Sequence, residues 1–305
     1  MPVPADTQQE AEERLNLMHL MDQGSYKVPN RRVDENLILA TWNIQQFSEK
    51  KTWRALKYIA DIIERFDIVA VQEIKSNLHG LGKLQAILPG RYRVLVSDVT
   101  GNTERFAFIY DERTVESTGL VAEIGLGLEP TTHEGFQLHR MPYCASFKAG
   151  RFDFTVVSVH IFESSLYFRE KEIDRLAQEV KDLSKREQSK VFDRDFFVVG
   201  DFNIKEAGDR FFAALVRHGF IMPPGLRTLT TNFKRTGTYD KIAWVDRDDF
   251  SFSGKCNVVP FYKAVYQDGD PPGGKKEISD HLPVWAEFYV NELTQQLDQV
   301  IHPPR

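Results

Sequence analysis

The sequence FFVVGDFNI, residues 196–204, joins a buried strand to the polar residues of a possible site. Its first five residues, Phe196 to Gly200, are apolar or lack a side chain, which is typical of a strand inside a sheet. An acid and an amide follow at alternate positions, Asp201 and Asn203. Side chains two residues apart on an extended segment point the same way. We therefore expect Asp201 and Asn203 to face one shared target.

Strand-like and helix-like runs alternate on both sides of this stretch. Several neighbouring strands read as hairpins, which favours a mixed α/β protein whose sheets pack on each other under an outer cover of helices. The expected strands are 36–43, 67–73, 92–98, 104–111, 143–149, 152–161, 238–245 and 283–290, and the expected helices are 50–66, 78–88, 164–185 and 208–220.

The chain divides into a long body and two short ends. Residues 1–34 are interpreted as an N-terminal extension with a short amphipathic helix, formed by Leu15, Met18 and Met21 with Leu17 and Leu20 beside them. Residues 35–290 form the body, which the sequence predicts to be one domain. Residues 291–305 form a tail with one small helix.

Composition excludes several classes of protein. Hydrophobic residues make up 42% of the chain, which is ordinary for a globular protein. The formal net charge is −5, so no strong overall electric field would draw the protein onto nucleic acid or an anionic membrane. Two cysteines, Cys144 and Cys256, exclude a disulfide framework but leave one bridge open, and two buried free thiols are the expectation. The N-terminus does not resemble a secretory signal and no apolar run is long enough to span a membrane. A cytoplasmic protein is the expectation.

Polar side chains gather where the apolar runs begin or end. Singly, each is the kind of residue that commonly forms a turn or cap. As a set they suggest a ligand site, because sites in α/β proteins lie at strand ends and carboxylate and amide oxygens are the ligands that Mg²⁺ prefers. Zinc spacing, a P-loop, a dinucleotide fingerprint and a nucleophile elbow are all missing from the sequence. The set is Asn43, Glu73, Glu104, His160, Asp201, Asn203, Asp240, Asp280 and His281.

The segments that carry these residues resemble the endonuclease/exonuclease/phosphatase superfamily, and within it the deoxyribonuclease I-like nucleases. They occur in the family's order over residues 37–289: TWNIQQF, DIVAVQEIK, SDVTGNTERFAFIYD, HRMPY, VVSVHI, FVVGDFNI, TYDKIAW and ISDHLPVW. The resemblance implies a four-layer α/β/β/α sandwich, with two packed mixed β-sheets flanked by helices and the site at one edge of the sheets.

The resemblance also implies a metal centre and a phosphate site. Glu73 resembles the main metal carboxylate, with Asn43 and Asp280 beside it, for Mg²⁺ with Mn²⁺ or Ca²⁺ as substitutes. Asn43 would also border the substrate phosphate. Asp201 resembles the residue that orients or deprotonates the attacking water. Asn203 would hold a phosphate oxygen or the charge that develops on it.

Two histidines, each with an acidic partner, complete the implied machinery. His160, paired with Glu104, resembles the acid that protonates the leaving oxygen. His281, paired with Asp240, would contact the scissile phosphate or share the duty of base. An imidazole suits proton transfer near neutral pH, and a carboxylate behind it fixes its tautomer.

Substrate contacts are less fully matched. Arg140 lies where the family often has a phosphate-binding arginine. Lys75 lies where a basic residue would enter a DNA groove, and the alternative for Lys75 is a solvated surface lysine. Before Glu104 the family carries an aromatic that packs on a sugar, but this chain has Asn102 and Thr103. The loop 125–140 is a candidate contact loop with little positive charge, so a modest salt dependence of DNA binding is expected.

Three functions remain in order of preference. The first is a Mg²⁺-dependent phosphodiesterase acting on DNA as an endonuclease. The second is a phosphatase or phospholipase C-type esterase acting on a phosphoinositide or a sphingomyelin-like lipid. The third is a binding module on an inactive enzyme fold, which the presence of every implied site residue disfavours. The sequence indicates no protein partner and leaves the oligomeric state open.

Overall fold

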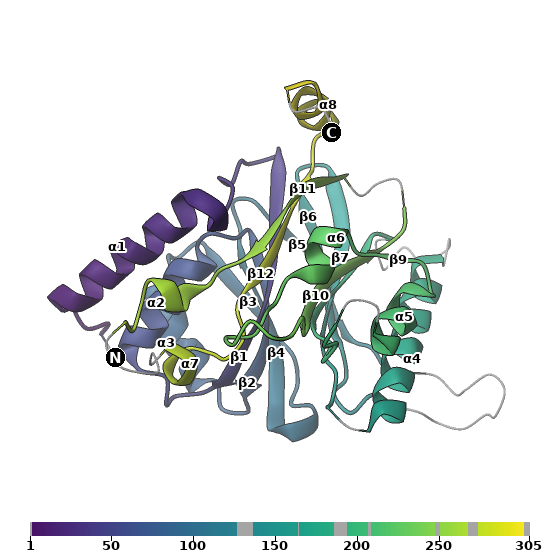
Figure 1. Cartoon of the computed structure of the whole chain (residues 1–305), viewed down its shortest axis with the longest axis horizontal. Helices are drawn as coiled ribbons and strands as arrows, with labels where there is room; N and C mark the ends of the chain where they lie inside the picture. The colour runs from purple at the N-terminus through teal and green to yellow at the C-terminus, as the bar shows by residue number, and fades with distance from the viewer. Residues whose placement is uncertain are drawn as a thin grey trace.

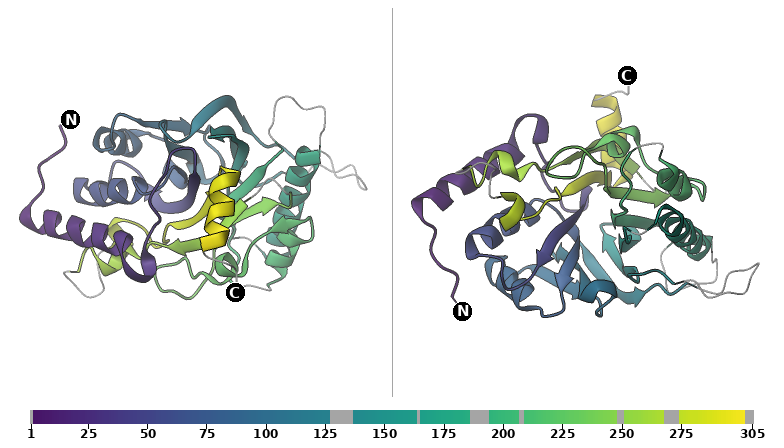
Figure 2. Two further views of the ribbon diagram at one scale, coloured as in Figure 1. Left: turned by 90° about the horizontal axis from the view of Figure 1, so that it is seen from above. Right: turned by 60° about the horizontal axis from the view of Figure 1, so that its bottom comes forward.

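Two β-sheets pack face to face between outer layers of helices (Figures 1 and 2). The computed structural model describes residues 2–126, 137–163, 165–185, 194–206, 209–247, 251–267 and 274–301. Within these, the first sheet has the order β11(Ser251–Val258), β12(Val284–Tyr289), β1(Asn36–Phe47), β2(Ile68–Lys75), β4(Glu104–Asp111), β3(Tyr92–Val96). The second has the order β5(Glu116–Glu123), β6(Tyr143–Ala149), β7(Phe152–His160), β8(Phe196–Asp201), β10(Asp240–Val245), β9(Phe220–Ile221). The four-layer sandwich is confirmed.

Helices cover the outer face of each sheet (Figure 1). The first sheet is flanked by α1(Gln8–Asp22), α2(Trp53–Ile63) and α3(His79–Ile87), and the second by α4(Leu166–Lys185) and α5(Arg210–Val216). Shorter helices are α6(Pro224–Thr228) and α7(Gly274–Glu277), and the tail forms α8(Glu292–Ile301). Among the described strands, β1 with β2 and β7 with β8 are parallel pairs.

A glycine allows the two central strands of the second sheet to approach each other. Gly200 of β8 has a φ of +135°, and a Cβ at this position would lie 2.0 Å from the carbonyl oxygen of Val159 on β7. No other residue type fits such an approach. Gly200 therefore sets the register in which the ends of β7 and β8 lie side by side.

The strands that were not expected lie away from the centres of the sheets. β5 and β11 are outer strands with mainly exposed or half-buried side chains, so they lack the apolar run of an interior strand. β9 has only two residues. The first strand continues past its expected end at Asn43 to Phe47. Its register with β2 shifts between these two residues, and Phe47 then pairs with Ile74.

The N-terminal helix α1 forms as expected, and its buried face contains part of the predicted apolar set together with an acid. Glu13, Leu17 and Met21 are buried, whereas Leu15 is 56% exposed. Glu13 belongs to this face because its carboxylate accepts hydrogen bonds from Arg54 of α2, at 2.6 Å, and from the backbone amide of Tyr266, at 2.9 Å. A simple apolar pattern does not reveal a buried ion pair.

The remaining general expectations concern thiols and membrane spans. Both cysteines are free, as predicted, although Cys144 is buried and Cys256 only half-buried. Burial raises the pKa of the Cys144 thiol to about 12. Among the helices in the described ranges, none is long and apolar enough to cross a bilayer.

Candidate active site

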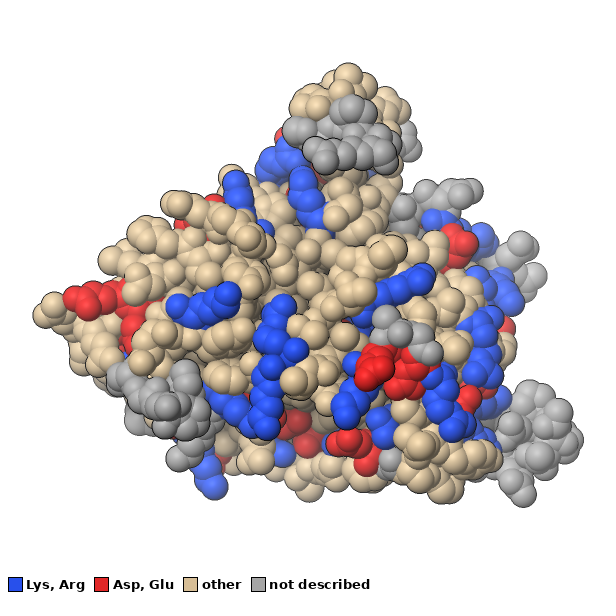
Figure 3. Space-filling view, viewed as in Figure 1, with Lys and Arg blue, Asp and Glu red and all other residues tan. Residues whose placement is uncertain are grey.

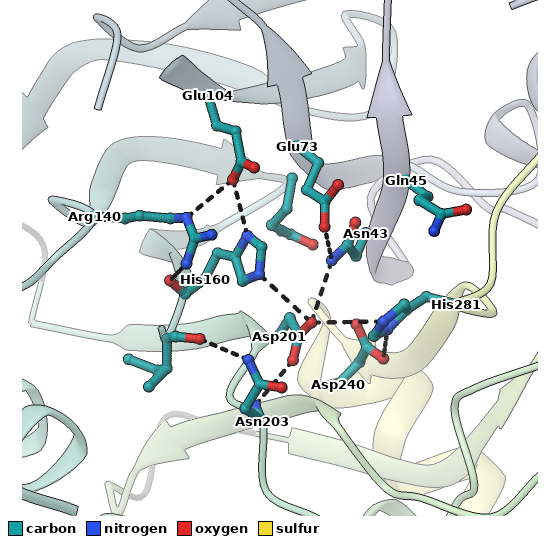
Figure 4. A network of polar contacts seen from close by, with 12 residues as sticks. Asn43, Gln45, Glu73, Glu104, Arg140, His160, Asp201, Asn203, Asp240 and His281 are labelled. Carbon is teal, nitrogen blue, oxygen red and sulfur yellow. Dashed lines mark hydrogen bonds and ion pairs between the residues drawn. The ribbon is translucent and has the colours of Figure 1, made fainter. Parts of the chain in front are cut away.

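Asp201 lies at the centre of a polar network at the edge of the two sheets (Figure 4). It is the last residue of β8, and its register places it opposite His160 on β7 and opposite Asp240 on β10. The side chain is almost completely buried. Burial alone would raise the pKa of Asp201, but the neighbouring His281 and His160 rings hold it below its usual value. A buried, ionised carboxylate is thus available at the point where several strands end.

Asn203 reaches the network by a turn rather than along an extended strand. β8 ends at Asp201, and Asn203 has a φ of +53°, so the expectation of a shared face on one extended segment is wrong. The backbone amide of Asn203 donates to Asp201 Oδ1 at 2.9 Å, and its Nδ2 donates to the carbonyl oxygen of Ile161 at 2.7 Å. The turn keeps the amide beside Asp201, where the two residues can still face one target (Figure 4).

Two backbone irregularities in the first sheet bring Asn43 and Glu73 together. The register between β1 and β2 shifts after Asn43. The register between β2 and β4 shifts after Val71, and within this irregularity Glu73 has a φ of +62°. Asn43 Nδ2 donates to Glu73 Oε1 at 3.0 Å and to Asp201 Oδ2 at 3.2 Å. Asn43 therefore links the end of the first sheet to the end of the second.

The surroundings of Asn43 fit a hard divalent cation. Its Oδ1 is buried and has no hydrogen-bond partner in the described part of the chain, which is costly unless another group satisfies the oxygen. The Glu73 carboxylate lies beside it. An amide oxygen and a carboxylate are the donors that Mg²⁺ prefers. The third expected ligand, Asp280, is half-buried and borders a surface pocket with Asn203 and His281.

The His160 ring lies between two carboxylates. Its Nδ1 is 3.3 Å from Glu104 Oε2, and its Nε2 is 3.8 Å from Asp201 Oδ2. Burial would raise the pKa of Glu104, but the contact with His160 and the charges of Arg140 and Lys75 hold it below its usual value. An ionised Glu104 can orient the imidazole and stabilise its protonated form.

Arg140 and Lys75, the expected phosphate and groove residues, both contact Glu104. Arg140 is buried; its Nε donates to Glu104 Oε2 at 2.9 Å and its Nη1 to the His160 carbonyl at 3.3 Å. Lys75 Nζ lies 3.4 Å from Glu104 Oε1. These contacts place both cations behind the His160–Glu104 pair, and direct contact with a substrate phosphate stays a prediction.

His281 and Asp240 form the second histidine–acid pair. His281 Nδ1 is 2.8 Å from Asp240 Oδ2, and its Nε2 is 3.7 Å from Asp201 Oδ2. Burial alone would lower the pKa of His281, but Asp240 and Asp201 more than offset it and raise the pKa to about 10. Ligand atoms of Asp201, Asp240 and His281 lie within 4.8 Å of one another. A protonated His281 cannot bind a metal ion, so a cation would be held by this cluster only with the ring in its neutral form.

Sequence reasoning missed two buried residues that hold the catalytic segments together. Ser279 Oγ donates to the Asn43 carbonyl at 2.6 Å and accepts from the amides of Gln45 and His281 at 3.2 and 3.0 Å. Lys51 Nζ donates to the Ile278 carbonyl at 2.5 Å, and burial lowers its pKa to about 8. Adjacency of Ser279 to Asp280 is the only signal in the sequence.

The network opens into a polar pocket at the surface. Its lining includes the half-buried Asn203, Asp280 and His281 together with the exposed Lys234, Lys275 and Glu163. In Figure 3, basic and acidic side chains are intermixed over the lower right of the face in view. Lys234 and Lys275 supply positive charge that would attract an anionic group to this pocket.

Fold and site together define a hydrolase that acts on phosphate esters. Residues 40–281 match the Endonuclease/Exonuclease/phosphatase family, and the chain belongs to that family. It is similar to a deoxyribonuclease from Thioalkalivibrio sp. (strain K90mix), with 28% identity over 91% of this chain and 79% of that protein. Human deoxyribonuclease-1 is 32% identical over 55% of this chain and 61% of its own length.

A solved structure with a related activity shares the fold. A mannosyl-6-phosphatase from Bacteroides thetaiotaomicron superimposes with a TM-score of 0.60 and 18% sequence identity, over 83% of this chain and 99% of the phosphatase. At that identity the likeness concerns the fold alone.

Proposed function

We propose that this protein is a Mg²⁺-dependent phosphodiesterase that cleaves DNA as an endonuclease. One observation carries the proposal: Asp201 Oδ2 lies within 3.8 Å of His160 Nε2, His281 Nε2 and Asn43 Nδ2. A single carboxylate oxygen thus adjoins two possible proton carriers and the group suited to hold a cation. Residues 35–290 would form the catalytic domain, and the family match within this range supports that boundary.

The first part of the mechanism is the handling of charge. A phosphodiester resists attack by water because its oxygens are negative, and a cation held by Glu73, Asn43 and Asp280 would offset the charge that develops in the transition state. His281, protonated and fixed by Asp240, would contact a non-bridging oxygen of the same phosphate. Asn203 would donate a hydrogen bond to another.

The second part is proton transfer. Asp201 would orient the attacking water and accept its proton, since it is ionised and adjoins both histidines. His160 would give a proton to the leaving oxygen, with Glu104 stabilising the imidazolium before the transfer. Arg140 and Lys75 would support Glu104 and add to the positive potential around the phosphate.

DNA is the substrate that the relatives favour. The similarity to a deoxyribonuclease extends over most of the chain, and mixed Lys, Glu and Asp side chains around the pocket fit a few phosphate contacts rather than a broad basic surface. An esterase acting on a phosphoinositide or sphingomyelin remains the alternative.

A substrate panel tests the proposal. The purified chain is given, at one Mg²⁺ concentration, duplex DNA, p-nitrophenyl phosphate, sphingomyelin and an inositol phosphate, and kcat/KM is measured for each. The proposal predicts the highest value for DNA by a wide margin. A higher value for the monoester or for the lipid would assign the same site to the alternative substrate class.

A further inference from the structure

The first turn of α4 exposes three consecutive apolar side chains. Leu166, Tyr167 and Phe168 are 56%, 62% and 55% exposed, and the two aromatic rings meet edge to face with centroids 5.4 Å apart. The same helix has a separate buried apolar face, which includes Ile173 and Leu176. The exposed residues therefore contribute little to the core, and a cluster of this kind commonly marks a binding surface.

This aromatic turn lies at the edge of the sandwich that holds the active site. α4 begins soon after β7, whose last residue is His160, so the start of the helix lies near that end of the strand. Arg169, the next residue after Phe168, donates from Nη1 to the Asn203 carbonyl at 2.9 Å. Glu163 borders the pocket that contains Asn203 and His281. Uncharged surface covers the lower end of α4 in Figure 3, in the orientation of Figure 1.

The charges around the aromatic turn favour a nucleobase over a membrane as its occupant. Glu163 and Glu170 flank it in sequence, and Glu170 pairs with Arg210 and Arg217 of the neighbouring segment. With Arg169, the described charges beside the turn are mixed in sign, whereas attraction to an anionic bilayer calls for a cluster of lysines and arginines without interspersed acids. The pocket beside the turn instead carries Lys234 and Lys275, which suit phosphates.

We infer that Tyr167 and Phe168 form a stacking platform for an unpaired base of the DNA strand whose phosphate lies at Asp201 and Asn203. The inference rests on the proposed function. Stacking on an aromatic side chain needs a free base face, which a single strand or a frayed end offers and an intact duplex does not. Since every base has a π-face, the platform gives a preference for unpaired DNA without sequence specificity.

The test compares Tyr167→Ala/Phe168→Ala with the wild type and with Leu297→Ala. Leu297 is 54% exposed on α8, which follows the far end of β12, so it is a matched exposed apolar control. Substrates are a single-stranded oligonucleotide, its duplex and the small diester bis(p-nitrophenyl) phosphate. We expect the double variant to raise KM for the single strand about tenfold or more. The small diester should be cleaved at the wild-type rate, and Leu297→Ala should change neither value.

Binding without turnover separates this inference from the proposed function. In EDTA, a single strand that contains 2-aminopurine should lose fluorescence on the wild type but not on the double variant. Equal quenching by both proteins, or an unchanged KM, overturns the platform. A double variant that loses affinity for phosphatidylcholine–sphingomyelin vesicles while it keeps affinity for the single strand overturns it in favour of a membrane contact. Cleavage of the small diester without cleavage or binding of any DNA instead refutes the proposed substrate, and the platform with it.

Discussion

His160 and His281 direct their Nε2 atoms at the same oxygen, Asp201 Oδ2, from 3.8 and 3.7 Å. Each ring has its own carboxylate on the other nitrogen, Glu104 for His160 and Asp240 for His281. The two pairs come from both sheets, and Asp201 lies between them (Figure 4). This arrangement gives the site two distinct imidazoles around one carboxylate, and the predictions below separate their roles.

Loss of His160 should slow the reaction in a way that depends on the leaving group. His160→Ala is expected to lower kcat on DNA by about 10²–10⁴-fold, because the leaving oxygen loses its proton donor. p-Nitrophenolate needs little protonation, so bis(p-nitrophenyl) phosphate should suffer much less. His218→Ala, which removes a histidine paired with Asp174 on the α4–α5 surface, serves as the control. An equal loss on both substrates would give His160 a different role.

Removal of the Glu73 charge should weaken the binding of Mg²⁺ to the site. Glu73→Gln keeps the size of the side chain but makes it a poorer cation ligand. Mutation of residues that only support metal ligands lowers metal affinity by about 10–100-fold, so the Mg²⁺ concentration for half-maximal activity should rise by at least that factor. A Mg²⁺ titration of activity measures this, with Glu116→Gln on the exposed edge strand β5 as control. An unchanged titration curve would remove Glu73 from the metal site.

The Asn203 side chain should matter more for rate than for affinity. Asn203→Ala removes a donor to the charge that develops on a phosphate oxygen, and this charge is largest in the transition state. We expect kcat to fall by about 10²-fold or more while KM changes little. Steady-state kinetics on a short duplex give both values, and a raised KM with normal kcat would make Asn203 a ground-state binding residue.

Ser279 should affect catalysis by positioning. Ser279→Ala removes two hydrogen bonds to β1, at Asn43 and Gln45, and one within its own segment, to the amide of His281. Ser146→Ala is the matched control, because Ser146 is equally buried and bonds Thr155 at 2.7 Å within the second sheet. Each variant should lose about 1–3 kcal/mol of unfolding free energy. Only Ser279→Ala should also lower kcat and shift its pH profile; similar kinetics for both variants would reduce Ser279 to a stabilising residue.

Acid should destabilise the protein through Asp111. Its buried carboxylate contacts Arg31, Arg91 and Arg113 at 2.8–3.0 Å, and although burial opposes ionisation, these arginines hold the pKa of Asp111 below its usual value of 3.8. A depressed pKa means that the stabilisation is present above that usual value and is lost as pH falls below it. Asp111→Asn should lower the free energy of unfolding at pH 7 by about 3–5 kcal/mol.

Thermal unfolding at several pH values checks this account of Asp111. The gap in Tm between wild type and Asp111→Asn should stay nearly constant from about pH 6 to about 4 and should narrow as pH falls from about 4 to about 2. Glu112→Gln breaks an exposed pair with Arg93 and should change Tm very little. A gap that stays constant from about pH 4 down to about pH 2 would show that the Asp111 charge does not provide the stability.

The sequence predicted the parts of this protein that depend on continuous apolar runs. β7 and β8 are such runs, and their polar ends at His160 and Asp201 were found because a buried strand that ends in a charged group is conspicuous. Outer strands such as β11 were missed because half-exposed side chains carry a weak pattern.

Features set by backbone conformation and long-range contacts could not be read from local pattern. The left-handed conformations of Glu73 and Asn203 bring both residues into the site. Asn adopts this conformation more often than most residues, but neither Asn nor Glu requires it, so the sequence does not fix it. Ser279 bonds to a carbonyl more than two hundred residues earlier in the chain. The expected contact loop at 125–140 lies largely outside the described residues, which resume at 137, so His133 has no structural account.

Plasmid nicking tests the central claim most directly. Supercoiled plasmid is incubated with the wild type in Mg²⁺, with the wild type in EDTA, and with His160→Ala in Mg²⁺, and the conversion of supercoiled to open-circular DNA is followed with time. The account predicts rapid nicking by the wild type in Mg²⁺, none in EDTA, and a rate lower by orders of magnitude for the variant. Nicking that persists in EDTA, or that proceeds equally fast without His160, would contradict it.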